Sequence, residues 1–396
     1  MRTVLLLLLL AGADDGRVKT VARHGRSWRG TIDGFPLLVL RGSPSERGEA
    51  HGRLAGAEIL RMIDALSGAL HRHKPGTWDG ALVPAARRFE WPPRYEAELR
   101  AMAAALPAER RVAALGRDAT LEDLMTLNVL GDLLGGGCSS FAAWGPLTAD
   151  GRLLLGRTTD YTSFPVLDGF VLVATDPAEE GRRPTLELSG FGCVGASTAL
   201  NDDGAFVALH DESGLPGPRD GRWAPRTLVL REAVEKAAGA TAVDDVSAFL
   251  RGARVKMGNN VHVAGPAGPS AVLEWDGNPK DGGVTVRRGG PASTVCTNHY
   301  VDRAARSNDG SQARYDTLAR AIEGHRATGR TIGEAEARAM LASVSRSGGS
   351  TTYFSVIVHP AARRYGFAVA PAAGSSAAEG RWIPVSWTEV FGSERR

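Results

Sequence analysis

The stretch "GDLLGGGCSSFAAWG", from Gly131 to Gly145, divides the chain into two parts with different residue patterns. Before it, apolar residues recur at helical spacing, and after it short apolar segments alternate with turn residues. Three consecutive glycines end the last helical segment, and Cys138 then opens a segment typical of a strand. Because ordering glycines costs backbone entropy, this junction needs a physical explanation.

The pattern before the junction predicts helices over residues 46–73, 94–106 and 120–134. Thr120 can cap the third helix, with Asp123 three residues further on. We therefore expect residues 14–137 to form a mainly helical segment.

The pattern after the junction predicts hairpins of short strands. Amphipathic helices interrupt them in pairs, over 226–238 and 242–253 and again near 312–324 and 332–344. Antiparallel sheets covered by helices form an α+β layered fold, which is the fold class that we expect.

Composition excludes several classes of protein. The chain has 396 residues, with 47 basic and 44 acidic residues and a formal net charge of +3. No block of Lys or Arg forms a phosphate-binding stripe, so we expect no nucleic-acid partner. Residues 1–13 carry a short apolar run before a small-residue site, which predicts an export signal. The protein would then be periplasmic or secreted, and otherwise cytoplasmic, with no membrane span.

The three cysteines, Cys138, Cys193 and Cys296, form neither a disulfide scaffold nor a CxxC metal site. In an exported protein Cys193 and Cys296 could pair and leave Cys138 free. Both could equally be small buried side chains in strands. The sequence leaves these two alternatives open.

The junction itself has two interpretations. One is a flexible linker followed by a strand with a buried cysteine. The other is self-cleavage between Gly137 and Cys138, because glycine leaves the scissile carbonyl unobstructed. Cleavage would give Cys138 a free α-amine, whose pKa of about 7.7–8 suits a general base at neutral pH. One residue would then supply both the nucleophile and the base.

The segment "GCSSFAAWGPLTADGRLLLGRTTDY" resembles the start of the mature chain in N-terminal-nucleophile hydrolases. It is similar to the family of acyl-coenzyme A:6-aminopenicillanic acid acyltransferases, relatives of choloylglycine hydrolases and penicillin V acylases. The resemblance covers roughly residues 40 to 370, and its order of motifs matches Cys138 to the nucleophile.

The resemblance also assigns supporting residues. Arg157 and Asp160 match an RxxD pair, in which an arginine favours the thiolate and a carboxylate orients the new amine. Asn201 and Asn298 match asparagines that bind the oxyanion, although Asn201 also lies in a sequence typical of a turn. Arg314 matches an arginine that supports the network of the aspartate and the amine.

The resemblance implies a four-layer αββα sandwich of the N-terminal-nucleophile type. Residues 14–137 would be a prosegment that stays bound as a small chain, and residues 138–396 would be the catalytic chain. The expected reaction is hydrolysis of a small amide, or acyl transfer from an amide or thioester, with no cofactor or metal. The pocket is not readable, but Trp144, Tyr161, Phe164 and Trp223 are candidates for its lining.

Two alternatives remain at this stage. A papain-like cysteine protease would need a histidine partner, for which His210, His262, His299 and His359 are the candidates. Its usual C-G-S-C-W signature is absent. An exported binding protein that has lost catalysis is the other alternative.

Overall fold

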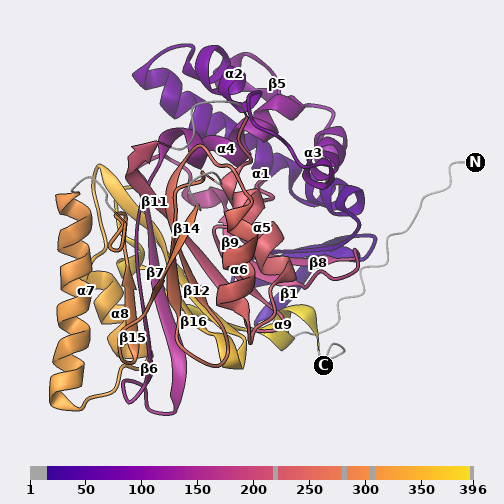
Figure 1. Ribbon diagram of the computed structural model, residues 1–396. Coiled ribbons are helices and arrows are strands. Elements are labelled where there is room, and N and C mark those ends of the chain that lie inside the picture. Colours follow the sequence, from indigo (N-terminus) through magenta and orange to yellow (C-terminus); the bar gives the residue numbers. More distant parts are fainter. Residues whose placement is uncertain (1–15, 217–221, 279–282, 304–307, 393–396) are drawn as a thin grey trace, which may run out of the picture.

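The computed structural model describes residues 16–216, 222–278, 283–303 and 308–392. The predicted export signal therefore lies outside the described residues and stays a prediction. Within the described residues, the strands form two large, mainly antiparallel sheets and one small two-stranded sheet (Figure 1).

The larger sheet has ten strands. In spatial order these are β1 (Val18–His24), β2 (Ser27–Ile32), β3 (Phe35–Gly42), β8 (Phe170–Pro177), β9 (Thr185–Gly190), β10 (Thr198–Asn201), β11 (Phe206–Pro216), β12 (Met257–Ala264), β13 (Ala271–Trp275) and β14 (Val284–Arg288). The second sheet has six strands, in the order β15 (Ser293–Cys296), β6 (Gly137–Gly145), β7 (Gly151–Thr162), β16 (Ser350–His359), β17 (Arg364–Val369) and β18 (Ile383–Ser386). The small sheet pairs β4 (Arg111–Val112) with β5 (Arg117–Asp118).

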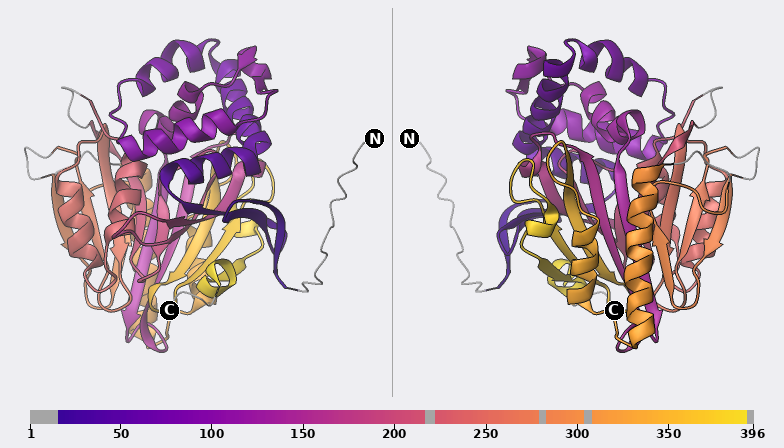
Figure 2. Two further views of the ribbon diagram at one scale, coloured as in Figure 1. Left: turned by 90° about the vertical axis from the view of Figure 1, so that its right-hand side faces the viewer. Right: turned by 90° about the vertical axis from the view of Figure 1, so that its left-hand side faces the viewer.

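The helices of the described residues fall into two groups. The first group precedes Cys138 and contains α1 (Pro44–His73), α2 (Val83–Ala86), α3 (Pro93–Ala105) and α4 (Leu121–Leu134). The other helices are α5 (Arg226–Lys236), α6 (Ala242–Arg251), α7 (Asp309–Thr328), α8 (Glu334–Ser343) and a short α9 (Trp387–Phe391). The first group caps one end of the sheets, as Figure 2 shows in purple.

Three apolar clusters hold the layers together. Side chains such as Leu172, Leu188 and Phe354 form the core that includes the space between the sheets. Leu230 and Leu250 belong to a second cluster, between the ten-stranded sheet and helices α5 and α6. A third cluster packs α7 and α8 against the six-stranded sheet. The order of layers is helices, sheet, sheet, helices, and the predicted α+β class is confirmed.

The predicted helices are confirmed, but the sequence did not predict three strands at the start of the chain. Residues 14–137 are not only helical, because β1, β2 and β3 join the ten-stranded sheet. β3 runs parallel to β8, with Leu38 opposite Val173. The apolar run "PLLVL" at residues 36–40 is typical of a buried parallel strand, which lacks the alternation expected of a half-exposed strand. The N-terminal part thus shares a sheet with the part after Cys138.

Capping explains where α1 and α4 begin. Ser43 and Glu46 form a capping box at the start of α1, and the Ser43 N–H donates to the Glu46 carboxylate at 2.7 Å. At α4 the backbone N–H of Thr120 donates to the Asp123 carboxylate at 2.8 Å, as the sequence predicts. α4 ends at Gly135, whose φ of 70° lies in the left-handed region that glycine adopts without strain.

The crossing of α1 and α3 depends on a close approach at Gly48. A Cβ atom at this position would lie 1.9 Å from the carbonyl oxygen of Glu98. The two helices therefore pack at a distance that only glycine allows.

We expect Gly48→Ala to lower the free energy of unfolding by about 1–3 kcal/mol, because the helices must separate to admit the methyl group. The control is Gly324→Ala in α7, where nothing lies within 4 Å of the added Cβ. That change should stabilise the protein by up to about 1 kcal/mol, because alanine has the higher helix propensity. Urea denaturation of both variants measures the difference, and equal effects would contradict the packing.

Candidate active site

The pairing of β6 with β7 sets the positions around Cys138. Cys138 lies opposite Thr159, and Gly137 lies opposite Asp160. Residues opposite each other share a face of the sheet, and successive residues alternate between faces. Arg157 therefore lies on the face of the Cys138 thiol, whereas Asp160 lies on the other face, beside Gly137.

The Cys138 thiol is buried against a guanidinium group. Arg157 Nη2 lies 3.3 Å from Cys138 Sγ and also donates to the carbonyl oxygen of Leu209 at 2.7 Å. Arg157 Nη1 donates to the hydroxyls of Thr159 and Thr198. Burial raises the pKa of the Cys138 thiol to about 11, although the charge of Arg157 acts in the opposite direction. In this uncut chain the thiol is therefore protonated at neutral pH.

Both backbone polar groups of Cys138 are hydrogen-bonded to side chains. Its N–H donates to Asn298 Oδ1 at 2.8 Å, and its carbonyl oxygen accepts from Arg314 Nη1 at 2.6 Å. Arg314 Nη2 also donates to Asn298 Oδ1, at 2.8 Å. Asn298 Nδ2 donates to the carbonyl oxygen of Asp211 at 2.6 Å. The structure thus brings Asn298 and Arg314 to Cys138.

One carboxylate oxygen of Asp160 makes no hydrogen bond in the described part of the chain. Asp160 Oδ1 accepts from the Thr352 hydroxyl at 2.6 Å, whereas its buried Oδ2 has no hydrogen-bond partner among the described residues. That oxygen lies 3.4 Å from the position of a Cβ built on Gly137. Burial raises the pKa of the Asp160 carboxyl, and Arg314 and Arg346, at 3.9 and 3.8 Å, act against that rise.

Asn201 is placed away from this cluster. Its Nδ2 donates to the carbonyl oxygens of Val234 and Ala237, both at 2.8 Å, at the end of α5. Its Oδ1 accepts from the N–H groups of Asp203 and Ala205. Since backbone groups use the whole side-chain amide, the turn explains Asn201, and the structure does not bring it to the oxyanion position expected from the resemblance.

Asp211 and Arg226 belong to the site but were missed from the sequence. Asp211 Oδ1 forms an ion pair with Arg226 Nη1 at 2.5 Å, and Asp211 contributes to the raised pKa of Cys138. Arg226 Nη2 donates to the carbonyl oxygen of Gly131 at 2.7 Å, and its backbone N–H donates to Asp132 on α4. The available signal was the polar pair "HD" directly after the apolar strand "GAFVAL".

A cavity of about 170 Å³ is lined in part by Arg157, the residue that contacts the Cys138 thiol. It lies between α4, β7, β11 and α5. Its apolar lining includes Leu127, Phe170, Leu188, Leu209 and Phe354, and its polar lining includes Arg157, Asp211 and Arg226. Tyr161 lines it too, whereas Trp144, Phe164 and Trp223 are not among its lining residues.

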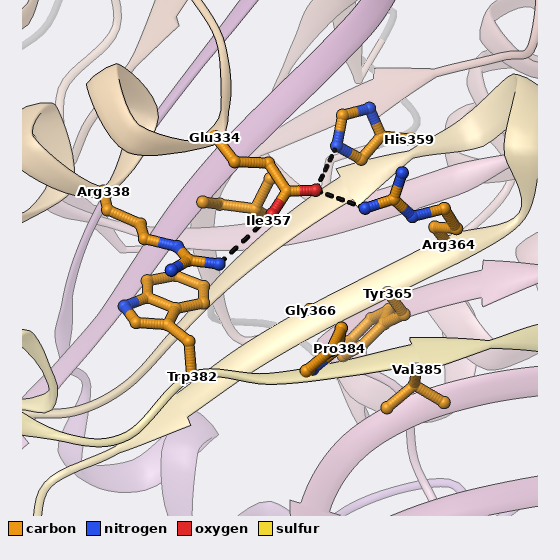
Figure 3. Close-up of a pocket in the computed structure, with 10 residues that line it drawn as sticks. All are labelled: Glu334, Arg338, Ile357, His359, Arg364, Tyr365, Gly366, Trp382, Pro384 and Val385. Atoms are coloured by element: carbon orange, nitrogen blue, oxygen red, sulfur yellow. Dashed lines mark hydrogen bonds and ion pairs between the residues drawn. The ribbon is translucent and has the colours of Figure 1, made fainter.

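A second hollow, on the outside of the six-stranded sheet, is a structural ion cluster (Figure 3). Glu334 accepts from Arg338 at 3.1 Å and pairs with His359 at 3.2 Å and with Arg364. Arg338 lies over the Trp382 ring at 5.0 Å. The free volume is about 10 Å³, which holds one water molecule at most, so the hollow is no substrate site.

The histidines do not form a papain-like pair with Cys138. His262 bonds to the hydroxyls of Ser140 and Ser270, and burial lowers its pKa to about 3. His299 bonds to Ser311, and His359 to Glu334. In the described part of the chain, no hydrogen bond joins a histidine to Cys138. The side chain that contacts the thiol is the guanidinium of Arg157 and not an imidazole.

The remaining cysteines are separate. All three cysteines are free. Cys193 lies in the connection between β9 and β10, whereas Cys296 lies in β15 of the six-stranded sheet, so the two do not pair. Across the described ranges, no group of three His, Cys, Asp or Glu side chains could hold a metal ion. No helix in those ranges combines the length and the hydropathy that crossing a membrane requires.

Comparisons with known proteins give a limited result. No family model matches the chain. An uncharacterized protein of Archaeoglobus fulgidus is 26% identical over an alignment of 234 residues. The match covers 52% of this chain and 38% of that relative's length. Three solved structures match part of the chain at low identity. The Caenorhabditis elegans ortholog of N-acylethanolamine-hydrolyzing acid amidase is 18% identical, and the match covers 62% of this chain and 99% of that chain with a TM-score of 0.41. Penicillin V acylase from Agrobacterium tumefaciens is 14% identical, with 65% of this chain and 89% of that chain covered and a TM-score of 0.45. A variant of conjugated bile acid hydrolase from Clostridium perfringens is 8% identical, with 64% of this chain and 93% of that chain covered and a TM-score of 0.46.

Glu187 on β9 is a further buried acid, next to the cavity residue Leu188. Burial raises its pKa from 4.5 to about 8, against the opposing charge of Arg231. Its Oε2 has no hydrogen-bond partner among the described residues. Between these two pH values the folded state keeps a proton that the unfolded chain has lost, so this group destabilises the fold as pH rises.

We expect Glu187→Gln to stabilise the protein increasingly from pH 4.5 to about pH 8. The gain should grow by up to about 1.4 kcal/mol per pH unit, because glutamine removes the titration. Urea denaturation of both proteins at a series of pH values measures it. A difference in free energy of unfolding that stays constant over this range would contradict the raised pKa.

Proposed function

We propose that this protein is a cysteine N-terminal-nucleophile amidohydrolase that activates itself by cutting the bond between Gly137 and Cys138. The observation that carries the proposal is the arrangement around one residue. Cys138 has Arg157 at its sulfur, Asn298 at its nitrogen and Arg314 at its carbonyl oxygen. These groups would serve both the cutting of the chain and the later reaction of Cys138 with substrate.

Self-cleavage begins with the Cys138 thiol attacking the carbonyl carbon of Gly137. The C–N bond then breaks, the thiol proton goes to the departing nitrogen, and the acyl chain is left on sulfur as a thioester. Water hydrolyses the thioester to a carboxyl group on Gly137 and restores the thiol. The high pKa of the buried thiol makes its deprotonation a barrier in the uncut chain.

The cut supplies a base beside the thiol. The new α-amine, with an ordinary pKa of about 7.7–8, accepts the thiol proton. Asp160 Oδ2, which has no hydrogen-bond partner among the described residues and lies near Gly137, would accept a hydrogen bond from that amine. Asn298 Oδ1 already accepts from the same nitrogen. Arg157 then stabilises the thiolate that forms.

The substrate reaction repeats the same chemistry. The Cys138 thiolate attacks an amide carbonyl, and the α-amine returns its proton to the leaving nitrogen. Asn298 Nδ2 donates one of its two hydrogens to the carbonyl oxygen of Asp211, and its second hydrogen would bind the oxyanion. One such donor contributes about 3 kcal/mol to the transition state. Water then releases the acyl group. A second amine in place of water would make the protein an acyltransferase.

Two sets of contacts support retention of residues before the cut. β3 pairs with β8 along six residue pairs, from Leu37–Leu172 to Gly42–Pro177. A buried ion network also joins α1 and α3 to α5. It contains Arg47–Glu98 at 3.1 Å, Arg231–Glu98 at 3.1 Å and Arg94–Glu235 at 2.7 Å. We propose that residues up to 137 remain bound as a small chain.

Intact mass under denaturing conditions tests the proposal. Wild-type protein should give two chains that meet at Gly137 and Cys138, and Cys138→Ala should give one uncut chain, because it lacks the nucleophile. Cys296→Ala is the matched control, since it removes a buried thiol that does not contact the cut, and it should be cleaved. An uncut wild-type chain, or a cut Cys138→Ala chain, would contradict the mechanism.

Gly136 tests the path of the chain into the site. A Cβ there would lie 2.2 Å from the Tyr161 ring, whereas one on Gly137 would lie 3.4 Å from its nearest neighbour. We expect Gly136→Ala to slow self-cleavage about 100-fold, because it displaces the scissile carbonyl by about 1 Å. Gly137→Ala should slow it far less.

The rates of appearance of the two fragments after synthesis measure this difference. Gly136→Ala combined with Tyr161→Ala should recover much of the lost rate, because the added methyl group then has space. Equal rates for Gly136→Ala and Gly137→Ala would show that the contact with Tyr161 does not position the bond.

A further inference from the structure

The segment Gly135–Gly137 follows a defined path over three side chains. A Cβ built on Gly135 would lie 3.7 Å from Asp211 Oδ2, and the Tyr161 ring lies directly against Gly136. Gly137 lies beside Asp160. Since the segment has no side chains of its own, it offers Asp211 only backbone.

Asp211 is incompletely satisfied in this arrangement. Its Oδ1 pairs with Arg226 Nη1 at 2.5 Å, but its Oδ2 has no hydrogen-bond partner among the described residues. The residue is 3% exposed, so water does not solvate that oxygen well. A buried charged acceptor left without a partner is destabilising, because it loses its hydration and gains nothing in return.

Asp211 also acts against the nucleophile. Its negative charge is one of the causes that raise the pKa of the Cys138 thiol. The charge therefore disfavours the thiolate on which the proposed reaction depends. An opposite charge placed near Asp211 would remove this effect, so binding of a cation there would assist Cys138.

The acyl part of a substrate must follow the path of the segment Gly135–Gly137, past Asp211. In self-cleavage the acyl group is the segment that ends at Gly137, and it becomes attached to Cys138 Sγ. A substrate acyl carbon must reach the same sulfur and the same hydrogen-bond donors. Two extended residues span about 7 Å, which is the length of chain between the Gly137 carbonyl and Gly135. Asp211, which lines the cavity beside Arg157, lies at that point.

We propose that Asp211 is a specificity-determining residue, which binds an ammonium group on the acyl part of the substrate about two residues from the scissile carbonyl. The substrates would be short amides of peptide-like acyl groups with a free amine. The ammonium would donate to Asp211 Oδ2, while Arg226 keeps the other carboxylate oxygen. This inference rests on the proposed function, because it takes Cys138 as the nucleophile.

Matched fluorogenic amides test the charge. Glycylglycyl-7-amido-4-methylcoumarin and its triglycyl counterpart carry an ammonium group at two distances from the scissile bond. Propionyl in place of the terminal glycyl group replaces the ammonium by a methyl group of similar size, and malonyl replaces it by a carboxylate. At one of the two lengths, kcat/KM of the self-cleaved wild type should favour the ammonium over the methyl compound about 10- to 100-fold, the range for a hydrogen bond to a charged group. The carboxylate compound should be the poorest.

The variant Asp211→Asn should reduce this preference to about twofold, by loss of the charge-assisted part of the bond. Asp132→Asn is the matched control, because Asp132 accepts from the Arg226 N–H but is not among the residues that line the cavity. It should keep the wild-type preference. The wild-type series decides the matter by itself even if Asp211→Asn does not fold.

The outcomes separate this inference from the proposed function. Self-cleaved enzyme that releases coumarin from ammonium and methyl compounds at equal rates overturns the role of Asp211 and leaves the proposed function standing. Self-cleaved enzyme that releases no coumarin from any compound also overturns it, because the path of Gly135–Gly137 then does not describe the substrate. A chain that does not cut itself is detected by mass before substrate is added, and it overturns both.

Discussion

The register between β6 and β7 is the constraint on which the rest of the site depends. Cys138 opposite Thr159 places the thiol on the face of Arg157, and Gly137 opposite Asp160 places the carboxylate beside Gly137. A slip of one residue would send the thiol to the other face of the sheet, away from Arg157. The buried guanidinium helps to fix this register, because it bonds to Thr159 on β7 and to Leu209 and Thr198 on the opposite sheet.

The junction also reconciles two opposing requirements. The end of α4 must be anchored, and Arg226 does this through the Gly131 carbonyl oxygen at 2.7 Å. The chain must then cross from the helix to β6 in a few residues, past the Tyr161 ring. Gly135 supplies the positive φ that ends the helix, and Gly136 supplies the close approach to that ring. Two of the three glycines, Gly135 and Gly136, are therefore needed for the path of the chain.

Local sequence predicted the elements better than it predicted their partners. The helices followed from local sequence. The group Cys138, Arg157, Asp160, Asn298 and Arg314 was named from the family resemblance, and the structure brings these five residues together. The pairing of β3 with β8 could not be predicted, because a parallel pair joins segments that are far apart in the chain. Asn201 could not be decided either, since a turn asparagine and an oxyanion donor have the same local sequence.

Asp211 shows the same limit from the other side. The polar pair after an apolar strand is the only local sign of Asp211, whereas its contacts with α5 and with the residues before Cys138 appear only in the structure. The effect of burial is equally invisible in the sequence. The motif places Arg157 at the thiol, but burial still raises the pKa of Cys138 to about 11. The cut that frees the α-amine is what would make this buried thiol reactive.

A crystal structure of the purified wild-type protein tests this central claim most directly. The account expects a break in the chain between Gly137 and Cys138, with the Cys138 α-amine at about 2.7–3.2 Å from Asp160 Oδ2. Arg157 Nη2 should remain beside Sγ, as it does at 3.3 Å in the uncut chain. Continuous electron density through an intact Gly137–Cys138 peptide bond would contradict the account, because Cys138 would then have neither a free amine nor a base.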